Sequence, residues 1–192
     1  MIRGVTALAA FVALTALVAL GALAGADRTI LDVVQLPHTS WLDLGASLIT
    51  VFGQSEVVGT IALAVAVVRL RAHRRDWWIP LLLVVVVAVE LLLKLTITQA
   101  PPPHELARTV QLIPFLESPT VFSFPSGHVA RVAFLVGALR WPALLSVSIV
   151  LITALTRVYL AEHWPSDVVG GWLLGYGIAA VAYRQPRILL PA

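Results

Sequence analysis

The chain contains no cysteine and a single lysine, Lys94, among its 192 residues. Without cysteine, it can form neither disulfide bonds nor metal sites with thiolate ligands. Charged residues are scarce as well, at 12% of the chain, whereas soluble domains contain about 25%. Hydrophobic residues make up 59% of the chain, and its mean hydropathy is +0.94. This composition excludes an ordinary soluble domain and predicts an integral membrane protein.

Six apolar runs have a length close to the roughly 20 residues that a helix needs to cross a bilayer. They cover Val5–Gly25, Val57–Leu70, Trp77–Thr98, Val129–Leu139, Ala143–Leu160 and Val168–Tyr183. The second and fourth runs are short, but they reach a plausible length when they are extended back to Ser55 and from Ser126 through Trp141. The sequence therefore predicts an all-α fold, a polytopic membrane helical bundle with six transmembrane helices. We expect a single membrane-embedded domain over residues 1–192.

The connections between these runs have weaker patterns. The first run is longer than the about 7–15 apolar residues of a signal peptide, so we expect it to be retained although Ala24-Gly25-Ala26 resembles a cleavage site. A short interfacial helix is expected from Thr29 to Leu36. The stretch from Gln99 to Pro125 is rich in proline, which fixes φ and lacks an N–H donor, and a stiff loop is expected there.

The arginines of the connections predict the orientation of the bundle. Only Arg28 and Arg108 lie in the loops of one side. The other side carries Arg3, Arg69, Arg71, Arg74, Arg75, Arg140, Arg184 and Arg187. Because cytoplasmic loops of membrane proteins carry an excess of positive charge, the arginine-rich side and both termini should be cytoplasmic. Topology thus explains the pI near 10, and we expect no nucleic-acid partner.

In this topology, several polar side chains converge on the extracytoplasmic face, although none of them was used to assign it. They are Lys94, Ser126, His128, Arg157, His163 and Asp167. Ionisable groups at membrane depth are costly, and they commonly mark functional sites. The sequence therefore predicts a multi-pass protein of the cell membrane with a functional site on its extracytoplasmic face.

Two of these segments look like helix starts. Ser126 is a good N-cap, and Gly127 has no Cβ, so that an anion can approach the backbone N–H groups that follow. Pro165 suits the first turn of a helix, and Asp167 suits its positive end. Free N–H donors together with the helix dipole form a ready site for an anion.

Each candidate also has a purely structural interpretation. A serine and a glycine after proline are commonly a turn and a cap, and His128 alone could be a hydrogen-bonded interface residue. Arg157 could extend to the lipid headgroups, and Lys94 could pair with Glu90 four residues earlier. Against this, every other basic residue is arginine, and the lone lysine indicates a position that requires a compact ammonium group.

The polar segments resemble the signature of the type 2 phosphatidic acid phosphatase superfamily, which also includes vanadium haloperoxidases and bacterial acid phosphatases. The second block of that signature, Pro-Ser-Gly-His, matches in full at Pro125–His128. The third block is Ser-Arg, five residues, His, three residues and Asp. It matches at Arg157, His163 and Asp167, with Thr156 in place of the serine.

The first block of the signature is a lysine, six residues and Arg-Pro. Lys94 and Pro102 match it, but Pro101 stands at the arginine position. Arg131, three residues after His128 and on the same face of its helix, is an additional candidate for the phosphate site. Two interpretations of Arg131 are open: it supplies the charge that Pro101 lacks, or it neutralises Glu90.

The resemblance implies an integral membrane lipid phosphate phosphatase that needs no metal and no cofactor. His163 would be the nucleophile that forms a phosphohistidine, and Asp167 would orient it. His128 would protonate the leaving oxygen and then activate water. The groups that would bind the phosphate are Lys94, Ser126, Gly127 and Arg157.

The expected partners are the bilayer and a lipid substrate, a phosphomonoester or diphosphate of an amphiphile. Polyprenyl phosphate or diphosphate, phosphatidylglycerophosphate and phosphatidic acid all fit, and the oligomeric state is open. Two alternatives remain: a lipid phosphotransferase that uses the same histidine, and a non-catalytic phospholipid-binding or transport protein.

Overall fold

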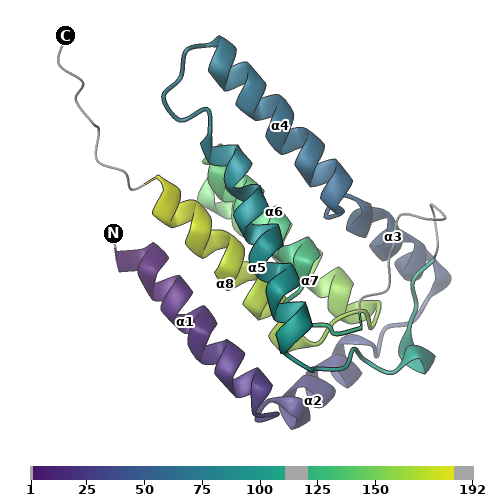
Figure 1. Ribbon diagram of the computed structural model, residues 1–192. Helices are drawn as coiled ribbons and strands as arrows, with labels where there is room; N and C mark the ends of the chain where they lie inside the picture. The colour runs from purple at the N-terminus through teal and green to yellow at the C-terminus, as the bar shows by residue number, and fades with distance from the viewer. Residues whose placement is uncertain (1, 111–120, 184–192) are drawn as a thin grey trace.

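The computed structural model describes residues 2–110 and 121–183, and all regular structure within them is helical (Figure 1). Six long helices run roughly alongside one another, and shorter ones lie across one end of the bundle. In chain order they are α1 (Ile2–Ala19), α2 (Ala24–Val34), α3 (Ser40–Val51), α4 (Ser55–Arg71), η1 (Ile79–Leu82), α5 (Leu83–Thr96), η2 (His104–Leu106), α6 (Gly127–Leu139), α7 (Ala143–Tyr159) and α8 (Pro165–Ala182).

The helix α6 occupies the centre of the bundle and packs most extensively against α8. Close approach of these two helices depends on two glycines of α8. A Cβ at Gly171 would overlap the carbonyl oxygen of Ser126, and one at Gly175 would overlap that of Ala130. The first turns of the two helices are joined directly, because the Ser126 N–H donates to the Asp167 carbonyl at 3.0 Å. The glycines therefore bring the second and third sequence blocks together.

Each of the six apolar runs forms a long helix, as predicted, with η1 and α5 sharing the third. By length and composition, two described stretches are suited to cross a membrane: Ile2–Ala19 and Ile79–Thr96. A third would be α3 with α4, which meet at a bend of 40°. Among the described residues α6 and α7 are shorter apolar helices. The number of spans and the side of the termini thus stay predictions.

The connection between the first two long helices differs from the expectation. The interfacial helix begins at Ala24, not Thr29, and a second helix, α3, follows it, which the sequence analysis did not predict. The Thr39 hydroxyl caps α3 by accepting a hydrogen bond from the Leu42 N–H at 3.2 Å. In α3 the side chains that face the protein include Ser47 and Thr50, whereas Trp41 is 83% exposed. The polar side of α3 thus faces the protein. A helix on the surface of a soluble protein is recognised by an apolar stripe on its inner side, and α3 has no such stripe.

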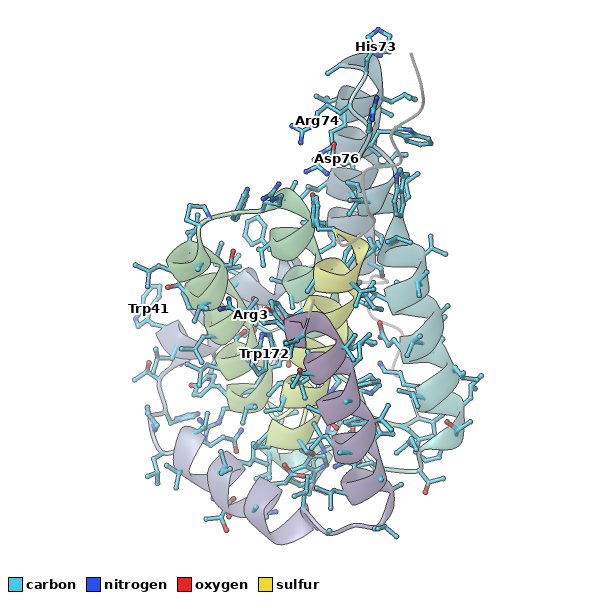
Figure 2. The ribbon with its side chains drawn as sticks, turned by 90° about the vertical axis from the view of Figure 1, so that its left-hand side faces the viewer. Arg3, Trp41, His73, Arg74, Asp76 and Trp172 are labelled. Atoms are coloured by element: carbon cyan, nitrogen blue, oxygen red, sulfur yellow. The ribbon has the colours of Figure 1, made fainter. Side chains whose placement is uncertain are left out.

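The arginine-rich end of the bundle is held by a buried guanidinium. Arg69 of α4 donates to the Ala138 carbonyl at 2.8 Å and to the Tyr183 hydroxyl at 3.1 Å, so it ties together the ends of α4, α6 and α8. Figure 2 shows the turn after α4, with His73, Arg74 and Asp76, where α4 and its neighbour extend beyond the other helices. A hydrogen bond from Arg74 lowers the pKa of the Asp76 carboxyl. Arg184 and Arg187 lie outside the described residues.

Candidate active site

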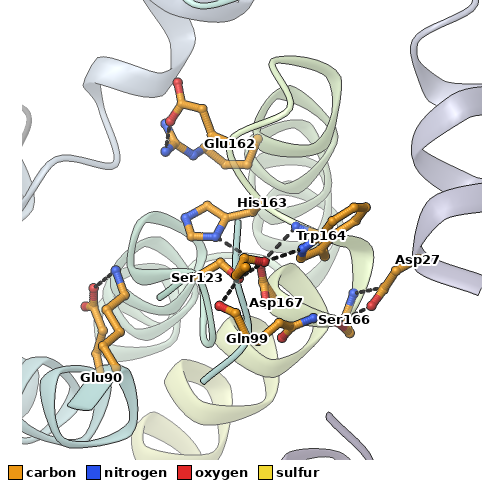
Figure 3. Close-up of polar contacts among 12 residues, drawn as sticks. Asp27, Glu90, Gln99, Ser123, Glu162, His163, Trp164, Ser166 and Asp167 are labelled. Atoms are coloured by element: carbon orange, nitrogen blue, oxygen red, sulfur yellow. Dashed lines mark hydrogen bonds and ion pairs between the residues drawn. The ribbon is translucent and has the colours of Figure 1, made fainter. Parts of the chain in front are cut away.

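The nucleophile predicted from the sequence lies in the turn between α7 and α8. The His163 Nδ1 atom is 3.2 Å from Asp167 Oδ2, and the same oxygen accepts the Trp164 backbone N–H at 2.9 Å (Figure 3). Asp167 is in the first turn of α8, where a carboxylate is favoured by the free N–H groups. Its side chain is fully buried, and His163 is 6% exposed. With Nδ1 bound to the carboxylate, Nε2 is left to carry the lone pair of the neutral ring.

The surroundings of His163 favour its neutral form. Burial, followed by the positive charges of Arg157 and Lys94, lowers the pKa of His163 well below its ordinary value of 6.5. Only the neutral imidazole has a lone pair to donate, so these groups keep the ring in its nucleophilic state at neutral pH.

The start of α6 supplies a second histidine and a serine with buried polar atoms. His128 Nε2 and Ser126 Oγ are inaccessible to solvent, and neither has a hydrogen-bond partner within the described part of the chain. Buried polar atoms are nearly always paired in native proteins, so two orphans at one helix start indicate a place for a polar ligand. The His128 ring packs against Gly53, where a Cβ would lie 2.8 Å from its Cδ2 atom.

The Lys94 ammonium group lies beside a buried carboxylate. Glu90 Oε1 is 3.2 Å from Lys94 Nζ, and Glu90 Oε2 is 2.7 Å from Arg131 Nη1. A Cβ at Gly127 would overlap the Glu90 carboxylate. The glycine of the second block is therefore required by Glu90, as well as by any anion that approaches the helix start.

The structure contains the contacts that the structural interpretations of Lys94 and Arg131 predict. Lys94 pairs with Glu90, and Arg131 pairs with Glu90 while also donating to the Gly53 carbonyl at 3.2 Å. Arg131 thus has the partner that the neutralising interpretation assigns to it. His128 lies within electrostatic range of Arg157, Arg131, Lys94 and His163.

Arg157, at the end of α7, makes contacts that the sequence did not indicate. It donates to the Thr50 hydroxyl at 2.6 Å and forms an ion pair with Glu162, whose other carboxylate oxygen accepts the Thr109 hydroxyl. Neither Thr50 nor Glu162 was among the predicted site residues. Glu162 immediately precedes His163, and this position beside the predicted nucleophile was the one signal that could have found it.

A fourth carboxylate binds the first turn of α8. Asp27 of α2 accepts the Ser166 N–H at 2.8 Å and the Ser166 hydroxyl at 2.7 Å. Burial raises the pKa of Asp27. Beside it is a cavity of about 330 Å³ between the α1–α2 connection, Ile97–Ala100 and Trp164. No group of three or more potential metal ligands occurs among the described histidines and carboxylates.

The fold and the sequence blocks are those of the PAP2 superfamily. The model of that superfamily matches residues 75–189, which is more than half of the chain, and the chain belongs to this family. The relatives named below are phosphatases, and one of them is a transmembrane protein, which agrees with the apolar helices of this chain.

Two curated relatives match this chain over part of their length. An undecaprenyl-diphosphatase of Sulfolobus acidocaldarius is 35% identical over 71 residues, or 34% of each chain. Phosphatidylglycerophosphatase B of Escherichia coli is 39% identical over 72 residues, which cover 33% of this chain and 28% of that protein. The match thus spans about a third of the length of these relatives.

A crystal structure is similar over nearly the whole chain. It is described as the first transmembrane PAP2 type phosphatidylglycerolphosphate phosphatase from Bacillus subtilis. The two folds agree with a TM-score of 0.74 over 98% of this chain and 100% of that one, at 23% sequence identity. The shared fold includes the bundle in which α6 and α8 meet.

Proposed function

We propose that this protein is a phosphatase of lipid phosphates that works through a phosphohistidine, without a metal ion. The observation that carries the proposal is the buried His163–Asp167 pair at 3.2 Å, next to a helix start with two orphaned polar atoms. Binding of an anion requires cations and N–H donors, but it does not require an oriented, neutral imidazole. Family membership supports the same activity.

The proposed reaction uses the buried groups in two steps. His163 Nε2 attacks phosphorus in line, a P–N bond forms, and the bond from phosphorus to the leaving oxygen breaks. His128 gives its proton to that oxygen, then takes one from the water that cleaves the P–N bond. Asp167 accepts from Nδ1 and stabilises the positive charge that develops on the ring.

We assign the phosphate oxygens to four groups near the two histidines. In our proposal they are bound by Lys94, Arg157, the Ser126 hydroxyl and the Gly127 N–H. Electrostatic positioning of this kind is the main catalytic resource in phosphoryl transfer. We assign Arg131 to Glu90 instead, because that ion pair is present and buried.

For the substrate we propose an amphiphile whose phosphate or diphosphate reaches the site at headgroup depth. The names of the curated relatives include both a diphosphate and a phosphomonoester of lipids. Purified protein in detergent should release inorganic phosphate from a panel of such lipids, with chelator present. Phosphorylated lipid acceptors without free phosphate would show a phosphotransferase instead, and no turnover of any kind would favour the binding protein.

We further propose the six-span topology, with one membrane domain and the site on the extracytoplasmic face. The absence of cysteine from the sequence allows a direct test. Cysteines introduced at Arg74 and at Glu105, both exposed, should react with impermeant reagents from opposite sides of the membrane. Labelling of both from the same side would contradict this topology.

A further inference from the structure

Glu162 holds the guanidinium group that we assign to the substrate phosphate. One of its carboxylate oxygens forms an ion pair with Arg157 Nη2, and the other accepts the Thr109 hydroxyl. The side chains of Arg157 and Glu162 are 6% and 16% exposed, so the pair is largely shielded from water. An ion pair in such surroundings is screened little by salt.

The cations near the site already lie beside carboxylates. Glu90 pairs with Lys94 and with Arg131, and Glu162 pairs with Arg157. A phosphate that entered with Glu162 still on Arg157 would meet this carboxylate beside the guanidinium, and its oxygens would be repelled.

We infer that Glu162 is an internal anion that a substrate phosphate must displace from Arg157, so that weakly binding anions do not occupy the site. The inference rests on the proposed role of Arg157 as a phosphate ligand. The Thr109 hydroxyl provides a tether, because it can keep one carboxylate oxygen while the other leaves the guanidinium.

Displacement favours one class of phosphate over another. A phosphomonoester carries up to two negative charges, whereas the phosphodiester of an ordinary phospholipid headgroup carries one. The dianion competes with a carboxylate for a guanidinium more strongly than the monoanion does. Because both anions must break the same ion pair, Glu162 lowers the affinity of both, and the weaker-binding phosphodiesters of the bilayer then no longer occupy the site.

The test compares inhibition of phosphate release by two soluble probes, inorganic phosphate and dimethyl phosphate. Glu162→Gln keeps the shape and the contact with Thr109 but removes the charge. It should tighten inhibition by both probes by a similar factor, about tenfold, because both must break the same ion pair; tenfold corresponds to about 1.4 kcal/mol. Glu105→Gln, which removes the same charge from an exposed position in η2, should change neither.

Two further variants keep the outcome interpretable. Glu162→Asp retains the charge on a shorter side chain and should tighten inhibition less than Glu162→Gln does, and it serves as a second variant if the amide form is unstable. Unchanged or weaker inhibition in both Glu162 variants would overturn the inference. Arg157→Gln should lose the thermal stabilisation that inorganic phosphate gives the unchanged protein, a measurement that does not depend on turnover. If it does not, the proposed phosphate site itself is wrong, independently of Glu162.

Discussion

Replacing Arg131 by methionine should destabilise the protein more than replacing Arg131 and Glu90 together. The Glu90 carboxylate is buried between Arg131 Nη1 at 2.7 Å and Lys94 Nζ at 3.2 Å, and the side chains of Glu90 and Arg131 are 5% and 9% exposed. Removal of one member of a buried ion pair leaves the other charge without compensation, which costs about 3–5 kcal/mol. Because Lys94 still compensates part of the Glu90 charge, we expect the lower end of that range.

Replacement of both partners by apolar residues has a different expected cost. A buried ion pair that is exchanged for apolar side chains of similar volume is often neutral or stabilising. Glu90→Leu with Arg131→Met should therefore regain stability that Arg131→Met loses, but only part of it, because the Lys94 ammonium group then loses its contact with the Glu90 carboxylate. The coupling energy of the cycle should be about 1–3 kcal/mol, the upper part of the usual range for residues in contact.

The assay is unfolding of the four proteins of the cycle in the same detergent, together with phosphate release at saturating substrate. In Arg131→Met, Glu90 should hold Lys94 more tightly, and turnover should fall. The double variant should recover turnover, because neither residue touches the phosphate in our proposal. A double variant that folds but loses both turnover and inhibition by phosphate would show that Arg131 is itself a phosphate ligand.

Three further results are expected. His163→Ala should remove turnover, and Asp167→Asn should lower it by about 10⁴-fold, as for an orienting aspartate in a triad; near-normal rates in His163→Ala would exclude it as the nucleophile. The pKa of His163 is held below 6.5, so kcat/KM should not fall near pH 6.5 through protonation of this ring. The free energy of unfolding should decrease as the pH falls below 6.5, because the unfolded chain binds this proton at a higher pH than the folded protein does. Gly175→Ala should destabilise the α6–α8 contact, measured by thermal unfolding, while Gly59→Ala in α4, which has open space around it, should be neutral or stabilising.

Sequence reasoning located the long helices because lipid-facing helices are apolar over most of their length, and that signal needs no knowledge of the tertiary packing. It failed at α3 for a related reason. The side of α3 that packs on the protein carries Ser47 and Thr50, and its exposed side carries Trp41, so the usual assignment of polar residues to the outside is reversed. The missed helix matters to the site, because Thr50 contacts Arg157 and the bend that follows it contacts His128.

The contacts of the candidate site were predictable where both residues lie within one helix turn. His163 and Asp167 are four residues apart around a helix start, so their contact follows from local geometry. The i,i+4 rule found Lys94 with Glu90, and the pairing of Arg131 with Glu90 was one of two open interpretations. That Glu162 binds Arg157 did not follow, because it depends on the path of the turn after α7 and on which side-chain rotamers fit there.

Glu90 and Glu162 are not part of the family signature, but their presence beside the cations of the site has a physical explanation. An uncompensated guanidinium or ammonium at membrane depth is costly, so a site for phosphate must be stabilised when no phosphate is bound. Glu90 and Glu162 provide that compensation here, and Pro101, at the arginine position of the signature, leaves one fewer cation to compensate. In our proposal, the same ion pairs oppose substrate binding. Stability of the empty site and affinity for phosphate are therefore coupled through these two glutamates, and a variant that raises one should lower the other.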